Sequence, residues 1–117
     1  QHGRLVLVLP DKEFTFDHNR PITTLTHLIE DYNNHVTESD TTHFEEVIAL
    51  HDFKYDTFVK SKDDLINRTH LNIENRAVHH HVFNLGLIKE LLIYCGFEMV
   101  HQQTYPPFHL VSIAQKK

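Results

Sequence analysis

Cysteine, glycine and tryptophan are scarce in this chain of 117 residues, which has one cysteine, three glycines and no tryptophan. The single cysteine, Cys95, excludes an intrachain disulfide and favours a reducing, cytoplasmic setting. The longest purely aliphatic run, Leu5 to Leu9, is too short to cross a bilayer, and no charged-then-apolar signal segment opens the sequence. We therefore expect a cytoplasmic chain with no membrane association.

Positive charge is also thin. Eleven lysines and arginines against 16 acidic residues give a formal charge of −5, and the basic residues form no stripe. The sequence therefore has no basic patch of the kind that binds nucleic acid. A length of 117 residues predicts one domain, residues 1–117, with a modest core. Histidine is the compositional outlier, with 12 residues.

The first predicted element is a strand. Leu5 to Leu9 is continuously aliphatic rather than alternating, which is typical of a strand buried on both faces. Such a strand needs neighbouring strands and helical cover on both sides. We therefore expect it to belong to a larger sheet than this chain supplies.

Helical spacing of apolar residues follows in several segments. Thr42 and Glu45 have the spacing of a capping box, and Gly96 stands where a helix end needs a left-handed residue. Cys95, at the end of an apolar helix, is expected to be a small buried hydrophobe. The predicted helices are Thr24–Asn34, Thr42–His51, a short segment opened by Ser61 and Asp64, and Leu85–Cys95. We expect Thr23 or Thr24 to cap the first of these helices and Asn84 to cap the last.

Two further strands are predicted near the end of the chain. Phe97–Thr104 and Phe108–Gln115 are joined by Tyr105-Pro106-Pro107, a turn short enough for an antiparallel hairpin. Antiparallel pairing of Leu5–Leu9 with Phe108–Gln115 would complete a three-stranded sheet.

Several motifs resemble one known family. The chain is similar to a bacterial group of predicted class I S-adenosylmethionine-dependent methyltransferases, in which the first strand here corresponds to the fifth strand of the fold. Three separate motifs in the right order carry the resemblance over nearly the whole chain. They are the Pro10-Asp11-Lys12, Phe14–Asp17, Arg20-Pro21, Thr24 and His27–Tyr32 series, then His43–Glu46, then His79–Phe83.

The resemblance implies an α/β fold class. The chain would be the C-terminal part of a Rossmann-like methyltransferase fold, with a three-stranded mixed sheet and three to four helices. The glycine-rich loop and the acidic residue that hold the cofactor lie on the early strands of such folds, and this chain has no G-x-G. It should therefore bind S-adenosylmethionine poorly or not at all by itself, because the cofactor-binding half is absent.

The resemblance also places Asp17, His18 and Arg20 beside the methyl acceptor, because ligands lie outside the carboxyl ends of strands. Asp17 and His18 are the expected catalytic residues, since methyl transfer to oxygen needs a base and histidine accepts a proton readily near neutral pH. Arg20 could clamp an acidic group of a small-molecule or saccharide-linked acceptor. Alternatively, Asp17 and Arg20 pair with each other to fix the loop.

His79, His81 and Tyr105 are the other expected substrate-binding residues. His79 and His81 would share one face of an extended segment, where they could also bind a metal together. A third ligand would have to come from His43, His51 or Glu46, which no local spacing supports. We therefore expect no metal ligands, and His27 is interpreted as a helix-surface or core residue.

Two other functions stay open at this point. One is a histidine-rich metal-binding module, and the other is a non-catalytic interaction domain on a methyltransferase-like scaffold. In either case the aliphatic edge of Leu5–Leu9 predicts self-association, most simply as a two-fold dimer, because an unprotected strand edge recruits another strand.

Overall fold

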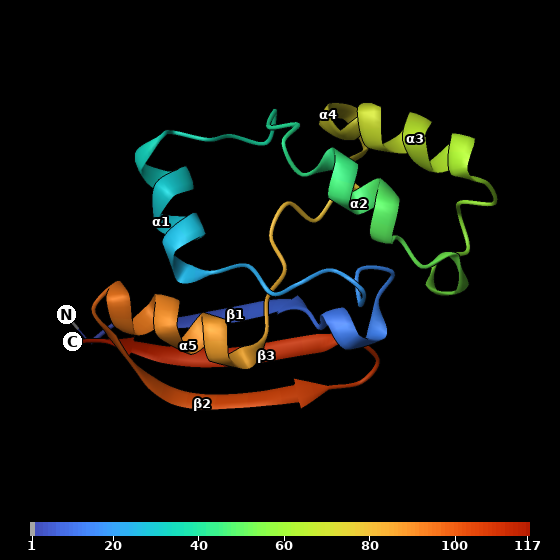
Figure 1. Ribbon diagram of the computed structural model, residues 1–117. Helices are drawn as coiled ribbons and strands as arrows, with labels where there is room; N and C mark the ends of the chain where they lie inside the picture. Colours follow the sequence, from blue (N-terminus) through green and yellow to red (C-terminus); the bar gives the residue numbers. More distant parts are fainter. Residues whose placement is uncertain (1) are drawn as a thin grey trace.

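The structure is a computed structural model that describes residues 2–117. Its sheet brings the two ends of the chain together. Strand β1 (Arg4–Pro10) pairs with β3 (His109–Lys116), and β3 pairs with β2 (Phe97–Tyr105), so that the order is β1-β3-β2 (Figure 1). Both pairings are antiparallel. The predicted strands, hairpin and β1–β3 pairing are therefore confirmed, whereas the predicted mixed sheet is wrong because this chain contributes only antiparallel neighbours.

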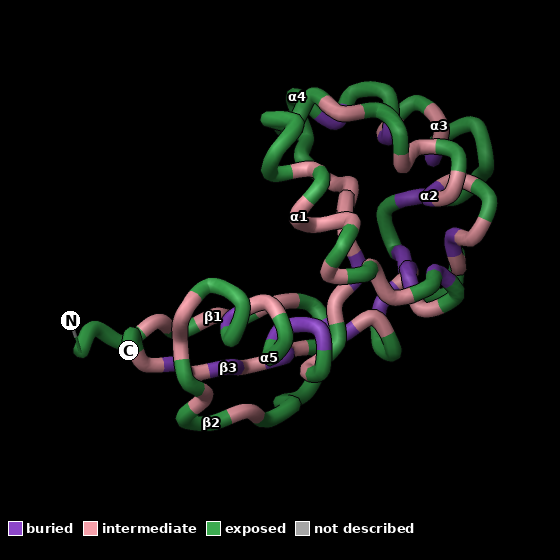
Figure 2. Tube along the Cα trace, turned by 60° about the vertical axis from the view of Figure 1, so that its left-hand side comes forward, coloured by how far each residue is buried: buried purple, intermediate pink, exposed green. Residues whose placement is uncertain are grey.

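Helix α5 (Leu85–Tyr94) packs on one face of this sheet and forms the main hydrophobic core. The buried centre of the core consists of Ile88, Leu92, Leu110 and Ala114. The inward side chains of β1 pack against it from alternate positions, because β-strand side chains alternate between faces. In Figure 2 the buried residues of this part of the molecule gather on α5 and β3.

The continuous aliphatic sequence of β1 predicts burial on both faces, and this prediction is wrong. Leu5, Leu7 and Leu9 pack against the core, but Val6 and Val8 are 58% and 54% exposed. The reason is that α5 covers one face of the sheet, and no helix among residues 2–117 packs on the opposite face of β1. β1 is also an edge strand, so one side of its backbone has no partner strand within the described chain.

The ends of α5 follow the predicted local chemistry. Asn84 caps the first turn by accepting a hydrogen bond from the Leu87 N–H at 2.8 Å. Gly96 adopts φ +83°, the left-handed conformation that terminates the helix and starts β2. Cys95, however, is exposed rather than buried, because it lies on the outward side of the helix end.

A separate helical part lies above the sheet in Figure 1. Two short 3₁₀ turns, η1 (Lys12–Phe14) and η2 (Phe53–Tyr55), belong to the connecting loops. The helices are α1 (Leu25–Asn33), α2 (Phe44–Leu50), α3 (Lys62–His70) and α4 (Asn72–Asn75). With α5 this makes five α-helices within residues 2–117, where the sequence predicted three to four. Between residues 2 and 117 no helix is long and apolar enough to cross a membrane.

Capping explains where these helices begin. Thr24 accepts from the His27 N–H and Ser61 accepts from the Asp64 N–H, as predicted for α1 and α3. The capping box predicted for α2 is wrong. Thr42 donates its hydroxyl to Asp40, and the residue at the cap position, His43, makes no side-chain capping bond.

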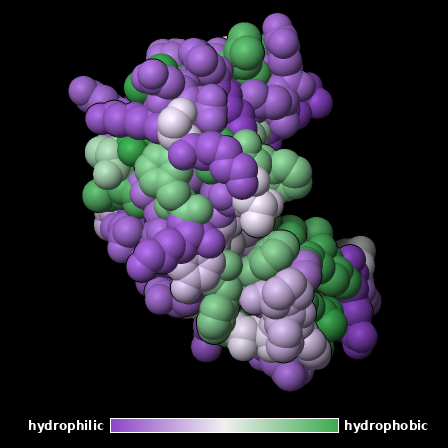
Figure 3. Space-filling view, turned by 90° about the vertical axis from the view of Figure 1, so that its right-hand side faces the viewer, coloured by the Kyte–Doolittle hydropathy of each residue, from purple (hydrophilic) through white to green (hydrophobic). Residues whose placement is uncertain are grey.

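Two segments without regular secondary structure, 15–24 and 76–84, connect the helical part to the sheet. They lie side by side, since the Thr23 N–H donates to the Val82 carbonyl at 2.9 Å and the Val82 N–H donates to the Thr23 hydroxyl at 2.8 Å. In Figure 3 hydrophilic residues dominate the upper part of the molecule, and hydrophobic surface lies in its middle and lower parts. The polar side chains singled out in the sequence lie on or beside these two segments.

Candidate functional site

The loop that follows β1 is folded back on itself by its own polar side chains. Asp11 caps η1 by accepting from the Glu13 N–H at 3.1 Å. The Lys12 ammonium donates to two backbone carbonyls, those of His18 at 2.9 Å and Arg20 at 2.8 Å. The Pro-Asp-Lys motif therefore acts on the shape of the loop, and it brings Asp17 back towards the end of β1.

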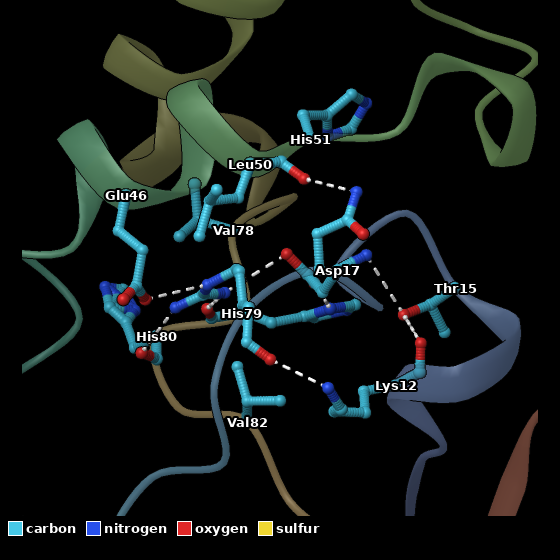
Figure 4. A network of polar contacts seen from close by, with 12 residues as sticks. Lys12, Thr15, Asp17, Glu46, Leu50, His51, Val78, His79, His80 and Val82 are labelled. Carbon is cyan, nitrogen blue, oxygen red and sulfur yellow. Dashed lines mark hydrogen bonds and ion pairs between the residues drawn. The ribbon is translucent and has the colours of Figure 1, made fainter.

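Arg20 lies at the centre of a buried network, which Figure 4 draws from close by. The residue is 1% exposed, and its guanidinium donates to Asp17 Oδ1 at 3.1 Å and to Glu46 Oε2 at 3.0 Å. It also donates to the backbone carbonyls of His79 at 2.6 Å and His80 at 3.2 Å. These contacts occupy Arg20 with protein groups, and this geometry favours the structural alternative over a substrate clamp.

The same network joins Asp17 to His79, 62 residues away in sequence. His79 Nδ1 lies 2.6 Å from Asp17 Oδ2, and the carboxylate is almost fully buried. Burial raises the pKa of Asp17, but the hydrogen bond and charge of His79 and those of Arg20 outweigh it, so that the pKa lies below its usual value. Asp17 is therefore ionised near neutral pH and orients the His79 ring.

The ring plane of His79 is fixed by a stacked aromatic neighbour. The Phe16 ring lies parallel to it, with a centroid distance of 5.4 Å and an interplanar angle of 8°. The Phe16 ring also contacts the ring of His51, with a centroid distance of 4.7 Å. An ionised carboxylate that accepts from Nδ1 leaves Nε2 as the acceptor nitrogen of a neutral imidazole. Among residues 2–117, Nε2 of His79 has no hydrogen-bond partner.

A cavity of about 270 Å³ opens beside this pair, at the carboxyl end of β1. Its wall combines apolar side chains with Lys12, Asp17 and three consecutive histidines. The lining residues are Leu9, Pro10, Lys12, Thr15, Asp17 and His79–Phe83. In this antiparallel sheet the carboxyl end of β1 adjoins the amino end of β3, where Pro10 pairs with His109.

Two other predicted site residues lie elsewhere. His18 Nε2 lies 2.6 Å from Asp52 Oδ2, and its ring contacts the edge of Tyr55, so that this histidine joins the loop to η2. Tyr105 is 44% exposed at the end of β2, opposite His109, and does not line the cavity. The structure therefore brings Asp17 together with His79 rather than with His18.

His79 and His81 do not belong to the same group of side chains, although they are two residues apart. His79 bonds Asp17, whereas His81 Nε2 lies 2.7 Å from Asp31 Oδ2. His81 belongs to a second group, which we call the histidine cluster: His27, Asp31, His43 and His81. The sequence predicted no metal ligands, yet the ligand atoms of this cluster all lie within 4.8 Å of one another.

The three glycines of this chain form no glycine-rich loop. Gly86 lies inside α5, Gly96 ends that helix, and Gly3 precedes β1. None stands in a strand-to-helix turn, where a glycine-rich loop would hold the cofactor.

No family model, curated protein or solved structure matches the chain significantly. We therefore infer function from the geometry of the site and from the sequence motifs.

Local sequence reasoning missed the partner of Asp17 and most of the histidine cluster. The Asp17–His79 contact spans 62 residues and has no periodic signature. One local signal did exist for the cluster, because His27 and Asp31 are four residues apart on a predicted helix and therefore share a face.

Proposed function

We propose that this chain contributes the methyl-acceptor side of an S-adenosylmethionine-dependent methyltransferase. The observation that carries the proposal is the Asp17–His79 pair, with its 2.6 Å contact, at the wall of the cavity beyond β1. A buried carboxylate, an oriented imidazole and a partly apolar cavity are the elements that general-base catalysis requires.

His79 is the proposed base, in place of His18. With Nδ1 held by Asp17, Nε2 of His79 would accept the proton that an acceptor hydroxyl loses as its oxygen is methylated. Asp17 would position the ring and stabilise the imidazolium that forms. Arg20 would act on this pair indirectly, because it holds both the Asp17 carboxylate and the His79 carbonyl.

The cavity suggests a small acceptor group. Its volume of about 270 Å³ lies just below the range of roughly 300–1,000 Å³ that is common for drug-sized ligands. A hydroxyl-bearing small molecule, or one sugar unit of a saccharide-linked acceptor, is the class that fits this proposal.

The cofactor half of the fold is proposed to pair with β1. This strand has a free edge, and Val6 and Val8 are exposed on the sheet face that α5 leaves uncovered. A neighbouring strand and a covering helix would remove this apolar surface from water, which is favourable at about 25 cal/mol per Å². S-adenosylmethionine would be held by that half and would supply the methyl group.

The test is methyl transfer by the polypeptide that carries both halves, with radiolabelled S-adenosylmethionine and a panel of hydroxyl-bearing acceptors. His79→Ala should lower turnover by about 10²–10⁴-fold without weakening cofactor binding. His101→Ala, which removes an exposed imidazole from β2, is the matched control and should leave turnover unchanged. Full turnover in His79→Ala, or no methyl transfer to any acceptor, would contradict the proposal.

A further inference from the structure

The histidine cluster has the spacing of a tetrahedral metal site. A zinc ion with ligands at 2.0–2.1 Å places its ligand atoms about 3.3 Å apart. In the cluster, His27 Nε2 lies 3.4 Å from His43 Nε2. Asp31 Oδ2 lies 3.1 Å from His27 Nε2 and 2.7 Å from His81 Nε2. Three of the separations between these ligand atoms are thus close to those that one ion would impose, and all of the ligand atoms lie within 4.8 Å of one another.

Three different segments supply these side chains. His27 and Asp31 lie one turn apart on the same face of α1. His43 stands at the N-cap position of α2, where Ser, Thr, Asp or Asn would normally cap. Its ring makes no capping bond and points instead towards His27 and His81, with centroid distances of 5.2 and 5.4 Å.

His81 reaches the cluster from segment 76–84, which is anchored on both sides of it. The Arg20 guanidinium holds the His79 and His80 carbonyls, and Val82 exchanges two hydrogen bonds with Thr23. The fourth ligand is therefore held in place by backbone contacts that do not involve the cluster itself.

The side chains of the cluster are partly shielded from solvent. Side-chain exposure is 38% for His27, 15% for His43 and 23% for His81. A metal ion binds deprotonated imidazole nitrogens and an ionised carboxylate, so zinc binding would release any proton that these ligand atoms carry.

We propose that the histidine cluster binds one divalent transition-metal ion, zinc before others, as a structural centre. Imidazole and carboxylate donors in a tetrahedral set are the ligands zinc prefers. Four protein ligands leave no open position for a water or substrate, which is the arrangement of structural rather than catalytic zinc. The ion joins α1, the start of α2 and segment 76–84, and so holds the helical part in shape. His81 lies both in the cluster and in the wall of the cavity, but the proposed base His79 lies outside the cluster, so a zinc titration tests this inference separately from the proposed function.

The test uses the untagged 117-residue chain, titrated with zinc chloride in competition with a chromophoric chelator. We expect one tight equivalent per chain, and Co²⁺ should give the intense visible absorption of tetrahedral nitrogen–oxygen coordination. His27→Ala and Asp31→Asn should each weaken zinc binding by about 100-fold or more, since the loss of a group that only hydrogen-bonds to a metal ligand already costs roughly 10–100-fold in affinity. His101→Ala is the control with an equal loss of imidazole and should bind as the parent does.

Thermal unfolding keeps the proposal testable if one variant folds poorly. Zinc at about 100 times its dissociation constant should raise the Tm of the parent chain by roughly 10 °C. His27→Ala replaces the most exposed member of the cluster and should keep its circular dichroism spectrum while losing this shift. An equal shift in His27→Ala, or no tight equivalent in the parent, would show that the cluster is only a hydrogen-bonded group in which Asp31 accepts from two histidines, and would overturn the proposal.

Discussion

Replacing Arg20 by glutamine should destabilise the fold severely, because the guanidinium is 1% exposed and makes four hydrogen bonds. The variant leaves the buried Asp17 carboxylate with one partner fewer and two carbonyls of segment 76–84 without their donor. Breaking a buried ion pair on one side costs about 3–5 kcal/mol. Glu46 is 39% exposed in its side chain, so solvent compensates part of its loss and the lower end of that range is the better figure.

The assay is urea denaturation followed by circular dichroism, because the midpoint and slope together give the free energy of unfolding. The matched control is Arg76→Gln. Arg76 also donates twice to a carboxylate, Glu38, but the two side chains are 70% and 55% exposed, so that the loss should stay below about 1 kcal/mol. If Arg20→Gln loses no more than Arg76→Gln, then Arg20 is not a structural group, and the alternative that it clamps an acidic acceptor regains support.

Three other outcomes follow from the structure. His51 is buried, and burial lowers its pKa from 6.5, with Arg68 adding to the shift and Asp56 opposing it. Below about pH 6.5 the unfolded chain therefore binds more protons than the folded chain, so the free energy of unfolding should fall as the pH drops through that range. His51→Leu should flatten this pH dependence, measured by urea denaturation. Gly96→Ala should lose about 1–2 kcal/mol in the same assay, because φ +83° disfavours any side chain, and an unchanged midpoint would contradict the left-handed helix end. The isolated chain should dimerise through β1 at high micromolar concentration, and Val6→Lys should restore a monomer; sedimentation that finds the parent chain monomeric would refute this.

Local chemistry in the sequence predicted much of the secondary structure. Asn84, Ser61 and Thr24 cap the helices that they were expected to cap, and Gly96 ends α5. These features depend on neighbours within a few residues, and therefore the sequence alone suffices. The exposed face of β1 was not predictable in the same way, because its burial depends on what covers the sheet rather than on the strand's own residues.

The candidate site could be predicted only in part. The sequence singled out Asp17, Arg20 and His79, but it joined Asp17 to His18, which the structure pairs with Asp52. Adjacent residues on an irregular loop can point in different directions. A contact between residues more than 60 positions apart, such as Asp17–His79, produces no regular spacing in the sequence from which it could be predicted. The same limit applied to the histidine cluster, whose members come from three segments.

The central claim is that this chain supplies the acceptor side of a methyltransferase and that the cofactor is held by another part of the fold. Calorimetric titration with S-adenosylmethionine tests it most directly, performed side by side on this chain and on the polypeptide that also carries the proposed cofactor half. We expect no measurable heat of binding for the chain alone, whose three glycines form no cofactor loop, and micromolar affinity for the longer polypeptide. Micromolar binding by the chain alone, or no binding by the longer polypeptide, would contradict it.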